Sequence, residues 1–314
     1  MATQFTSTGV LYPGSSTRTT ARPARYRDKA IFGFGRSSAT YYSLTNIVNN
    51  TGLVSADVTN TSSTTRHSLA AAGYGGDKAI FGYGFTGSTT SLTNLVSNLG
   101  IVSGDVTGVG TARSSLAGAG YGGDKAIFGF GDTGAASDVC TLVSNIGVAV
   151  TESTGTGTAR YGLAAAGYGG DKAIFGYGRS GSNYYSVTNL VSNTGVVVAD
   201  VGGVGTSRQN LAAAGYGGDK AIFGFGIVST TFYSITNLVS NTGVVVGEVG
   251  GVGTPRDFLA AAGYGGDKAI FGYGRSSGGD QTITNLVSNV GVVVADVSGL
   301  GTARSQLAAS GFGS

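Results

Sequence analysis

Tryptophan is absent from this chain of 314 residues, and cysteine, histidine and methionine occur once each. The single cysteine, Cys140, excludes a disulfide within the chain and any site with several cysteine ligands. The single histidine, His67, excludes metal centres built from several histidines. Charged residues make up only 11% of the chain, less than half of the usual ~25%. These absences leave few side chains for catalysis.

Long apolar runs and a recognisable leader are also missing. The longest purely apolar stretches, such as Val196–Ala199, are far shorter than the ~20 residues of a membrane-spanning helix. The first residues, MATQFT, show neither the basic nor the apolar region of a secretory signal. We therefore expect no membrane insertion.

Glycine, in contrast, is abundant, with 58 residues, and an internal repeat explains it. The segment Asp-Lys-Ala-Ile-Phe-Gly, followed by Phe or Tyr and another Gly, occurs six times at intervals of 47 to 49 residues. Its copies start at Asp28, Asp77, Asp124, Asp171, Asp219 and Asp267. A period of this length is typical of β-propeller repeats.

Each repeat predicts four short strands separated by turns. In one unit these strands are expected at 211–216, 220–225, 234–240 and 244–249, with a variable stretch between the second and the third. Gly-Gly-Asp and Asn-Thr-Gly are residue combinations that favour tight hairpin turns. Nothing in the unit has a helical period. Four strands in about 48 residues correspond to one propeller blade.

The two ends of the chain predict how the ring closes. The last repeat begins at Arg304 and stops after its first strand, whereas no matching first strand precedes Asp28. We therefore expect the C-terminal strand to pair with the N-terminal blade. The resulting prediction is an all-β, six-bladed β-propeller of four-stranded blades over residues 28–314, preceded by an arm of residues 1–27. The repeats start near residues 28, 77, 124, 171, 219 and 267.

In this layout the sequence resembles kelch-repeat propellers. The family pattern is an Arg, a small apolar strand, a turn and a strand that ends in glycines. Gly-Phe-Gly or Gly-Tyr-Gly stands where the family has a Gly pair, and the late Trp of the family is missing. The position of the family Arg is occupied by Arg66, Arg113, Arg160, Arg208, Arg256 and Arg304. The long, nearly identical units are also similar to kelch-like repeat proteins of tailed-bacteriophage virions, which implies a structural role in a phage particle.

Most charges follow the repeat. An acid stands eight or nine residues before each repeat Arg, at Asp57, Asp105, Glu152, Asp200, Glu248 and Asp296. A charge that recurs six times indicates a structural role, because an active site has to differ from its copies. We expect the acid and the Arg to flank the crossover between blades and to pair with it or cap it. The alternative is a ring of charges along the axis that binds a metal or an anion.

The residues that break the repeat lie in the variable stretch between the second and third strands. Variation there against a constant framework is typical of a recognition face, and Arg with aromatic residues suits an interface. The alternatives are contact with a glycan, or variation because nothing constrains these loops. The candidate binding residues are Arg36, Tyr41, Tyr42, Arg179, Tyr184, Tyr185, Phe232, Tyr233 and Arg275.

The N-terminal arm, residues 1–27, carries four arginines and no acid, so the net positive charge of the chain resides there. We expect the arm to attach the protein to a neighbouring subunit, or else to be disordered. Four arginines without interleaved aromatic residues do not predict nucleic-acid binding. The attachment residues are Arg18, Arg22, Arg25 and Arg27.

Catalytic constellations are not found. His67 is expected at the surface or in a loop, and Cys140 is expected to be a small half-buried residue, not a nucleophile. The Gly-Tyr-Gly-Gly runs are not followed by a helix or by Gly-Lys-Ser/Thr, so they do not predict a phosphate loop. We expect no catalytic residues, no cofactor and no metal.

These observations predict a non-enzymatic structural and interaction protein. It would sit in a virion or tail and would dock other virion proteins, or further copies of itself, through the arm and one loop face. The alternative is a receptor-binding or glycan-binding propeller, similar to a lectin or adhesin, with a possible host-surface glycan as partner. The alternative locations are the cytoplasm, or the cell surface by a non-classical route.

Overall fold

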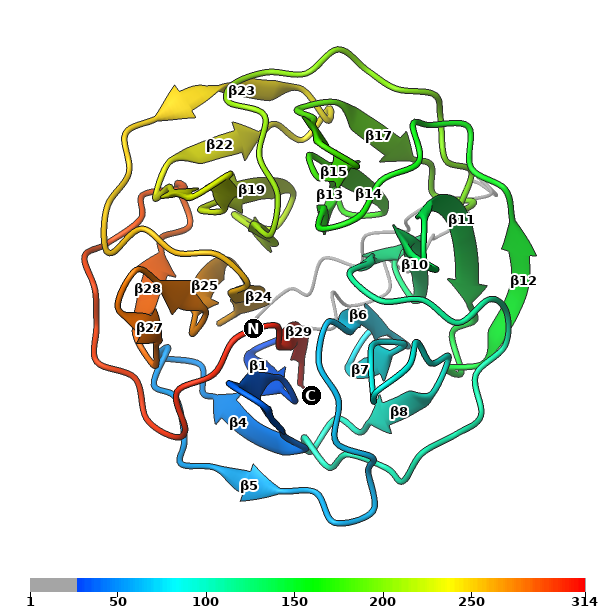
Figure 1. The fold of residues 1–314 in the computed structure, drawn as a ribbon, viewed down its shortest axis with the longest axis vertical. Coiled ribbons are helices and arrows are strands. Elements are labelled where there is room, and N and C mark those ends of the chain that lie inside the picture. The colour runs from blue at the N-terminus through cyan, green and yellow to red at the C-terminus, as the bar shows by residue number, and fades with distance from the viewer. Residues whose placement is uncertain (1–26, 314) are drawn as a thin grey trace, which may run out of the picture.

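The computed structural model describes residues 27–313, which form strands and turns without a helix. The prediction of an all-β chain is confirmed. The described strands assemble into six main sheets, and Figure 1 shows these sheets arranged in a ring around a common centre. Successive sheets follow one another around the ring in the order of the sequence.

Each main sheet has an inner strand, then a second and a third strand, and in some sheets an outer strand. The first sheet contains β29 (Ala308–Phe312), β1 (Lys29–Gly33), β4 (Leu44–Val48) and β5 (Val58–Thr59). The second sheet contains β6 (Ala70–Tyr74), β7 (Lys78–Gly82) and β8 (Thr93–Val96). The third sheet contains β9 (Ala117–Tyr121), β10 (Lys125–Asp132), β11 (Ala136–Val143) and β12 (Ala149–Ser153).

The other three sheets repeat this layout. The fourth contains β13 (Ala164–Tyr168), β14 (Lys172–Gly176) and β17 (Thr188–Val191). The fifth contains β18 (Ala212–Tyr216), β19 (Lys220–Gly224), β22 (Thr236–Val239) and β23 (Val245–Val249). The sixth contains β24 (Ala260–Tyr264), β25 (Lys268–Gly272) and β28 (Thr284–Val287). The strands of the fifth sheet match the four expected strands of that repeat to within two residues at each end.

The variable stretches form structure of their own. Four of them fold into small two-stranded hairpins, where the sequence predicted only a loop. These hairpins are β2–β3 (Arg36–Ser37, Thr40–Tyr41), β15–β16 (Arg179–Ser180, Asn183–Tyr184), β20–β21 (Ile227–Val228, Thr231–Phe232) and β26–β27 (Arg275–Ser276, Gly279–Asp280). Strands of two residues are too short to carry a periodic pattern, so they cannot be predicted from periodicity.

The fourth strand is weaker than expected. In the second, fourth and sixth sheets it pairs with the third strand only through isolated bridges, such as Val191 with Val197 and Thr188 with Val201. An outer strand has a partner on one side only and faces solvent on the other, so less of its backbone is held in the ladder.

The C-terminal strand completes the N-terminal sheet, as expected. β29 pairs antiparallel with β1 over five residues, from Lys29 opposite Phe312 to Gly33 opposite Ala308. Residues from the two ends of the described chain thus share one sheet, which links the first repeat to the last.

Backbone hydrogen bonds also join each sheet to the next at the Gly-Gly-Asp turns, which we call the Asp-Lys end. The first Gly N–H of each turn donates to the Asp carbonyl of the next sheet, at 2.7–3.0 Å. The six bonds run Gly75 to Asp124, Gly122 to Asp171, Gly169 to Asp219, Gly217 to Asp267, Gly265 to Asp28 and Gly313 to Asp77. Together they return to the starting sheet, so this end is held by an unbroken circle of bonds.

A buried arginine fastens each junction between sheets. Arg160 stacks over Phe130 of the third sheet, with its Cζ atom 4.3 Å from the ring centroid. Its Nε atom donates to the Tyr177 carbonyl at 2.7 Å and its Nη2 atom to Asn189 Oδ1 at 2.6 Å, both in the fourth sheet. Because the guanidinium is fully buried, a contact with both sheets in this low-dielectric setting is worth more than a surface pair.

The acid of each outer strand caps a crossover and pairs with a repeat Arg, but these are not the ones that follow it in the sequence. The sequence predicted that Asp200 flanks the crossover to Arg208, whereas Asp200 contacts Thr158 and Arg160 of the preceding crossover. Asp200 accepts hydrogen bonds from the Thr158 N–H at 3.1 Å and from Asn189 Nδ2 at 2.9 Å, and lies 3.7 Å from Arg160. Partial burial raises the pKa of Asp200, but hydrogen bonds from Thr158 and Asn189 and the charge of Arg160 outweigh it, so the net pKa is lowered. Equivalent pairs join the other repeat arginines to their acids.

The third sheet departs from this pattern. Thr141 stands where the other repeats have Asn and accepts from Arg113 Nη2 at 2.8 Å. The Nε atom of Arg113 has no partner among the described residues, whereas the Nε atoms of the other repeat arginines donate to a backbone carbonyl, and Arg113 reaches Glu152 directly at 2.9 Å. The contact between the second and third sheets is therefore maintained by a closer ion pair, between Arg113 and Glu152.

Between neighbouring sheets, the ring of a phenylalanine packs against the backbone of a glycine. Phe128 of the third sheet is fully buried and lies edge-on to Tyr83 of the second, with centroids 5.4 Å apart. A Cβ atom on Gly82 would lie 2.9 Å from the Phe128 ring, so only glycine fits this contact. The same arrangement of a Phe against a neighbouring Gly recurs around the ring.

We expect Asn189→Ala to destabilise the fold by roughly 2–3 kcal/mol, because it removes the buried partner of both Arg160 and Asp200. Chemical denaturation followed by circular dichroism measures this loss. The matched control is Asn193→Ala, which removes an exposed amide that donates to Asp171 at 3.1 Å and should cost about 0.5 kcal/mol or less. Equal losses in the two variants would contradict the role assigned to the buried junction.

Candidate binding face

The end of the ring opposite the Asp-Lys turns carries the residues that differ between repeats. The two residues after each repeat Arg vary in all six copies, whereas the Leu and the small apolar strand after them are nearly constant. These pairs are residues 67–68, 114–115, 161–162, 209–210, 257–258 and 305–306. Together with the variable stretches they form what we call the variable end.

The second residue of each pair belongs to a closed ring around the axis. Each has a positive φ of 52–64°, and its N–H donates to the carbonyl of the equivalent residue in the preceding sheet at 2.7–2.9 Å. The circle runs Gln306 to Phe258 to Asn210 to Gly162 to Ser115 to Ser68 and back to Gln306. These six positions surround a small cavity of about 80 Å³. Six different chain segments thus present varied side chains around one point.

The first residue of each pair lies beside the start of a variable stretch. Isolated bridges join His67 to Phe85, Tyr161 to Arg179, and Asp257 to Arg275. Equivalent bridges join Ser305 to Arg36, Ser114 to Asp132 and Gln209 to Ile227. A second, wider ring of varied residues therefore surrounds the first.

The structure brings the nine candidate residues to this one end. Arg36 pairs with Tyr41 in β2–β3, and Arg179 pairs with Tyr184 in β15–β16. Phe232 pairs with Ile227 in β20–β21. The next residues along the chain, Tyr42, Tyr185 and Tyr233, each donate their N–H to the Gly that precedes the stretch, at 2.9 Å. Arg275 begins β26.

The Arg275 side chain forms an ion pair with a buried carboxylate. Its Nε and Nη2 atoms donate to the two oxygens of Asp257 at 3.1 and 3.0 Å, and its guanidinium lies over Phe258 with Cζ 5.1 Å from the ring centroid. Asp257 is fully buried and also accepts from Asn210 Nδ2 at 3.3 Å. Burial raises the pKa of Asp257, and the charge of Arg275 opposes that rise. This cluster fixes the shape of the face at the sixth sheet.

Arg179 is placed differently. Its guanidinium stacks over Tyr161, with Cζ 5.1 Å from the centroid, and its Nε atom is buried without a hydrogen-bond partner among the described residues. The hydroxyl of Tyr184, in the same hairpin, accepts from the Ser229 N–H of the next hairpin at 2.9 Å. A half-buried guanidinium stacked on an aromatic ring is suited to bind a ligand that carries a hydrogen-bond acceptor.

His67 is buried in a third cluster, where the sequence predicted a surface or loop residue. Only 7% of its surface is exposed, because Tyr41 and Phe85 from two different sheets cover it, with centroids at 4.6 and 5.4 Å. Its Nδ1 atom shares a hydrogen bond with Ser68 Oγ at 2.9 Å. Burial, together with the nearby charge of Arg36, lowers the pKa of His67 to about 4.

Sequence reasoning missed the axial and flanking rings. It singled out the variable stretches but not the pairs after the repeat Arg. The signal was present, since no two copies have the same pair of residues at these positions, although the strand that follows is regular. Aligning the six repeats position by position would have found it.

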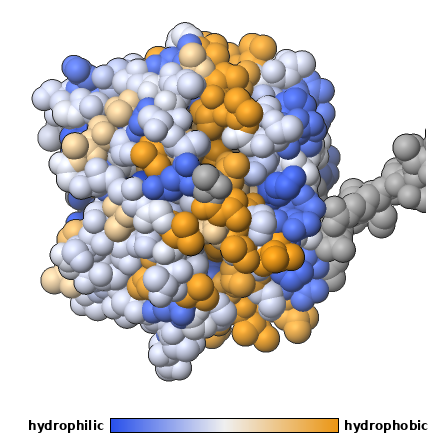
Figure 2. All heavy atoms as spheres, turned by 90° about the vertical axis from the view of Figure 1, so that its right-hand side faces the viewer, coloured by the Kyte–Doolittle hydropathy of each residue, from blue (hydrophilic) through white to orange (hydrophobic). Residues whose placement is uncertain are grey.

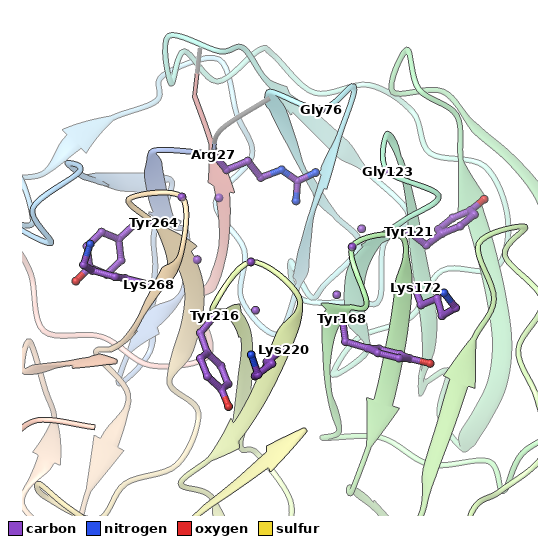
Figure 3. A pocket seen from close by; sticks show the side chains of 18 residues that line it. Arg27, Gly76, Tyr121, Gly123, Tyr168, Lys172, Tyr216, Lys220, Tyr264 and Lys268 are labelled. Carbon is purple, nitrogen blue, oxygen red and sulfur yellow. The ribbon is translucent and has the colours of Figure 1, made fainter. Parts of the chain in front are cut away.

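The Asp-Lys end holds a larger cavity of about 560 Å³. Figure 3 shows Arg27 extending into it, whereas Tyr168, Tyr216 and Tyr264 point away between the sheets. The wall is backbone: a Cβ atom on Gly215 would lie 3.2 Å from the Gly167 carbonyl of the neighbouring sheet. The lysines near the mouth are paired with their own aspartates, as Lys220 is with Asp219 at 3.2 Å. Among residues 27–313, the lining of this cavity is mainly glycine backbone, with the guanidinium of Arg27 inside it.

Of the four attachment residues, only Arg27 lies in the described part of the chain. Its carbonyl accepts from the Gly266 N–H at 3.2 Å, and burial lowers the pKa of its guanidinium. Arg27 therefore belongs to the ring as much as to the arm. The remaining attachment residues lie outside the described residues: Arg18, Arg22 and Arg25.

Cys140 is fully buried, where the sequence predicted a half-buried residue. Burial raises the pKa of its thiol to about 11, so the thiol stays protonated at neutral pH. Within residues 27–313, no group of three or more His, Cys, Asp or Glu side chains could hold a metal ion. The same residues contain no helix long and apolar enough to cross a membrane.

Comparison with known proteins adds no relative. No protein-family model matches the chain, and no curated protein matches it.

We expect the free energy of unfolding to fall as the pH drops from about 6.5 to about 4, in part through His67. In that window the unfolded chain binds a proton on His67 that the folded chain does not, because the pKa of His67 is lowered to about 4 in the fold. Urea denaturation at pH 7, 5.5 and 4.5 measures the loss.

The matched variant is His67→Gln, which should lose less stability across this pH range than the wild type. The carboxylates with lowered pKa, such as Asp200, lose their contribution only at lower pH, so they do not mask the difference. An identical pH dependence in the two proteins would show that His67 is not the buried neutral group described above.

Proposed function

We propose that this chain is a six-bladed β-propeller of the kelch type that acts as a non-enzymatic structural and interaction module. Three observations support the fold: six sheets of similar layout, the pairing of β29 with β1, and the circles of inter-sheet bonds at both ends. In a propeller these sheets are the blades. The fold alone does not identify a function, because propellers host many.

The observation that carries the functional proposal is the contrast between the two ends. The Asp-Lys end repeats the same turn in every blade, whereas the varied residues meet at the variable end in two rings around the axis. A rigid frame that displays varied side chains on one end is suited to recognition. Three of the charged side chains there already have partners, since Asp257 is paired with Arg275 and Arg179 is stacked on Tyr161, which favours binding over acid–base catalysis.

We propose a tailed-phage virion or tail as the setting, in which the variable end and the N-terminal arm dock neighbouring subunits. The resemblance of the long, nearly identical repeats to kelch-like phage proteins motivates this setting. Arg27 supports the position of the arm, because its backbone is bound to Gly266 at the Asp-Lys end. Arm and variable end would then contact different neighbours.

A chain without residues 1–26 should fold as the whole chain does but fail to enter the assembled particle. The truncation stops before Arg27, because that residue contacts the ring. Immunoblotting of purified particles measures incorporation, and thermal melting by circular dichroism checks the fold. Normal incorporation of the truncated chain would refute attachment through the arm.

The second candidate is a glycan-binding propeller, which the placement of Arg179 favours. Arg179 is half-buried and stacked on Tyr161, so the exposed part of its guanidinium is placed to donate to a saccharide oxygen beside an aromatic ring. A glycan array should then give a saccharide-dependent signal that Arg179→Ala reduces roughly tenfold or more, the loss expected for a charged hydrogen bond.

The matched control for the array is Lys172→Ala, at the opposite end of the ring, which should bind like the wild type. If the wild-type array gives no saccharide-dependent signal, the glycan candidate is rejected and the docking proposal stands.

A further inference from the structure

The large hydrophobic side chains that are exposed in residues 27–313 are confined to one region of each blade. All lie in the hairpin after the third strand, in the outer strand or in the crossover that follows. The most exposed are Ile146, Leu99 and Val290, at 72, 71 and 70%. We call this set the outer belt: the exposed Val, Leu and Ile side chains of residues 53–58, 99–109, 146–150, 196–201, 244–252 and 290–300.

The belt runs around the rim of the ring, between its two ends. Figure 2 views the rim from the side on which β12 lies in Figure 1, and a hydrophobic band crosses it between two more hydrophilic zones. In blade four, Val197 packs against the core while Val196 and Val198 face outward. A strand with one face in solvent normally carries polar residues at such outward positions.

The outer strands also lack the residues that usually prevent an exposed edge strand from pairing with another chain. Lys and Pro normally prevent exposed edge strands from pairing with other chains, but neither occurs in stretches such as Val196–Val201 or Val292–Val297, which share the sequence VVVADV. β23, for example, pairs only with β22 in the described structure, and most of its residues are exposed.

The charges of the outer belt do not oppose its contact with the outer belt of a second copy. The one charged residue in each of these stretches is the acid, and it is used within its own chain: Asp296 accepts from the Thr254 N–H at 3.0 Å and from Asn285 Nδ2 at 2.9 Å. Two belts in contact would therefore bring together apolar side chains without an unpaired charge on either side.

The size of the belt fits a contact shared among several copies. Full burial of a Val or Leu side chain removes roughly 100 Å² from water, so the half-exposed belt offers on the order of 1,000 Å² in all, distributed over the six repeats. One blade supplies only a fraction of the roughly 800 Å² that each partner buries in a stable interface. A lasting contact must therefore involve several blades.

We propose that the outer belt is a self-association surface through which copies of this chain pack rim to rim. The near-identical blades favour this occupant, because a contact that suits one blade suits the others, so only a partner present in several copies around the ring can cover the belt. The inference does not depend on what the variable end binds.

An engineered thiol tests the contact directly. Cys140 is the only cysteine and is fully buried, so Val198→Cys in the full-length chain creates a single accessible thiol on the belt. Mild oxidation should give disulfide-linked dimers on a non-reducing gel. The matched control is Lys125→Cys, which places an exposed thiol at the Asp-Lys end, away from both the belt and the variable end, and should stay monomeric at the same concentration.

Sedimentation velocity provides the second measurement. The wild type should associate as its concentration rises, and a variant changed in every blade should associate roughly tenfold more weakly, since Thr keeps the branched shape of Val but reduces the apolar surface. In this variant Thr replaces Leu53, Val58, Leu99, Ile101, Ile146, Val148, Val196, Val198, Val244, Val246, Val290 and Val292. A wild type that stays monomeric, equal cross-linking of the two thiols, or binding to phosphatidylcholine vesicles without self-association would overturn the proposal. If self-association fails but the chain still enters particles through its arm, the belt inference falls and the proposed function stands.

Discussion

Six buried arginines connect neighbouring sheets, and the rest of the structure depends on this contact. Each guanidinium stacks on an aromatic ring of one sheet and donates to a carbonyl or side-chain oxygen of the next. Burying a charge is costly unless its hydrogen bonds are satisfied. The Asn of the third strand, the crossover Thr and the acid of the outer strand are therefore all constrained by the same arginine, which explains why they repeat together.

This constraint separates the positions that can vary from those that cannot. The strands, the turns and the arginine cluster use nearly every repeated side chain for packing between sheets. The pairs after the arginines contribute mainly their backbones to the axial ring, so their side chains are free to differ, as Ser68, Gly162 and Phe258 do. Residues therefore differ between repeats mainly at positions where the fold requires only the backbone. The outer belt is different, because it repeats although it faces solvent.

The repeat made the strands and the pairing of the terminal segments predictable, because each follows from spacing within or between copies. It located the capping acids but not their partners, because each acid pairs with the Arg of the preceding junction and not with the Arg that follows it in the sequence. Other features depend on segments that meet only in the folded chain. The burial of His67 results from Tyr41 and Phe85, which reach it from two different hairpins. Asn210 and Phe258 meet beside the axis through a backbone bond between neighbouring sheets. No pattern within one repeat encodes such encounters, so the sequence located the variable stretches but not the rings they surround.

The two ends of the ring-forming segment meet at one place. Asp28, which precedes β1, lies against Gly313, which follows β29: a Cβ atom on Gly313 would be 2.9 Å from the Asp28 backbone nitrogen. Both belong to the Asp-Lys end, opposite the varied side chains. Any segment joined to either terminus therefore leaves from the same pole of the molecule. Both ends of the described chain therefore lie at one end of the ring, and the varied side chains lie at the opposite end.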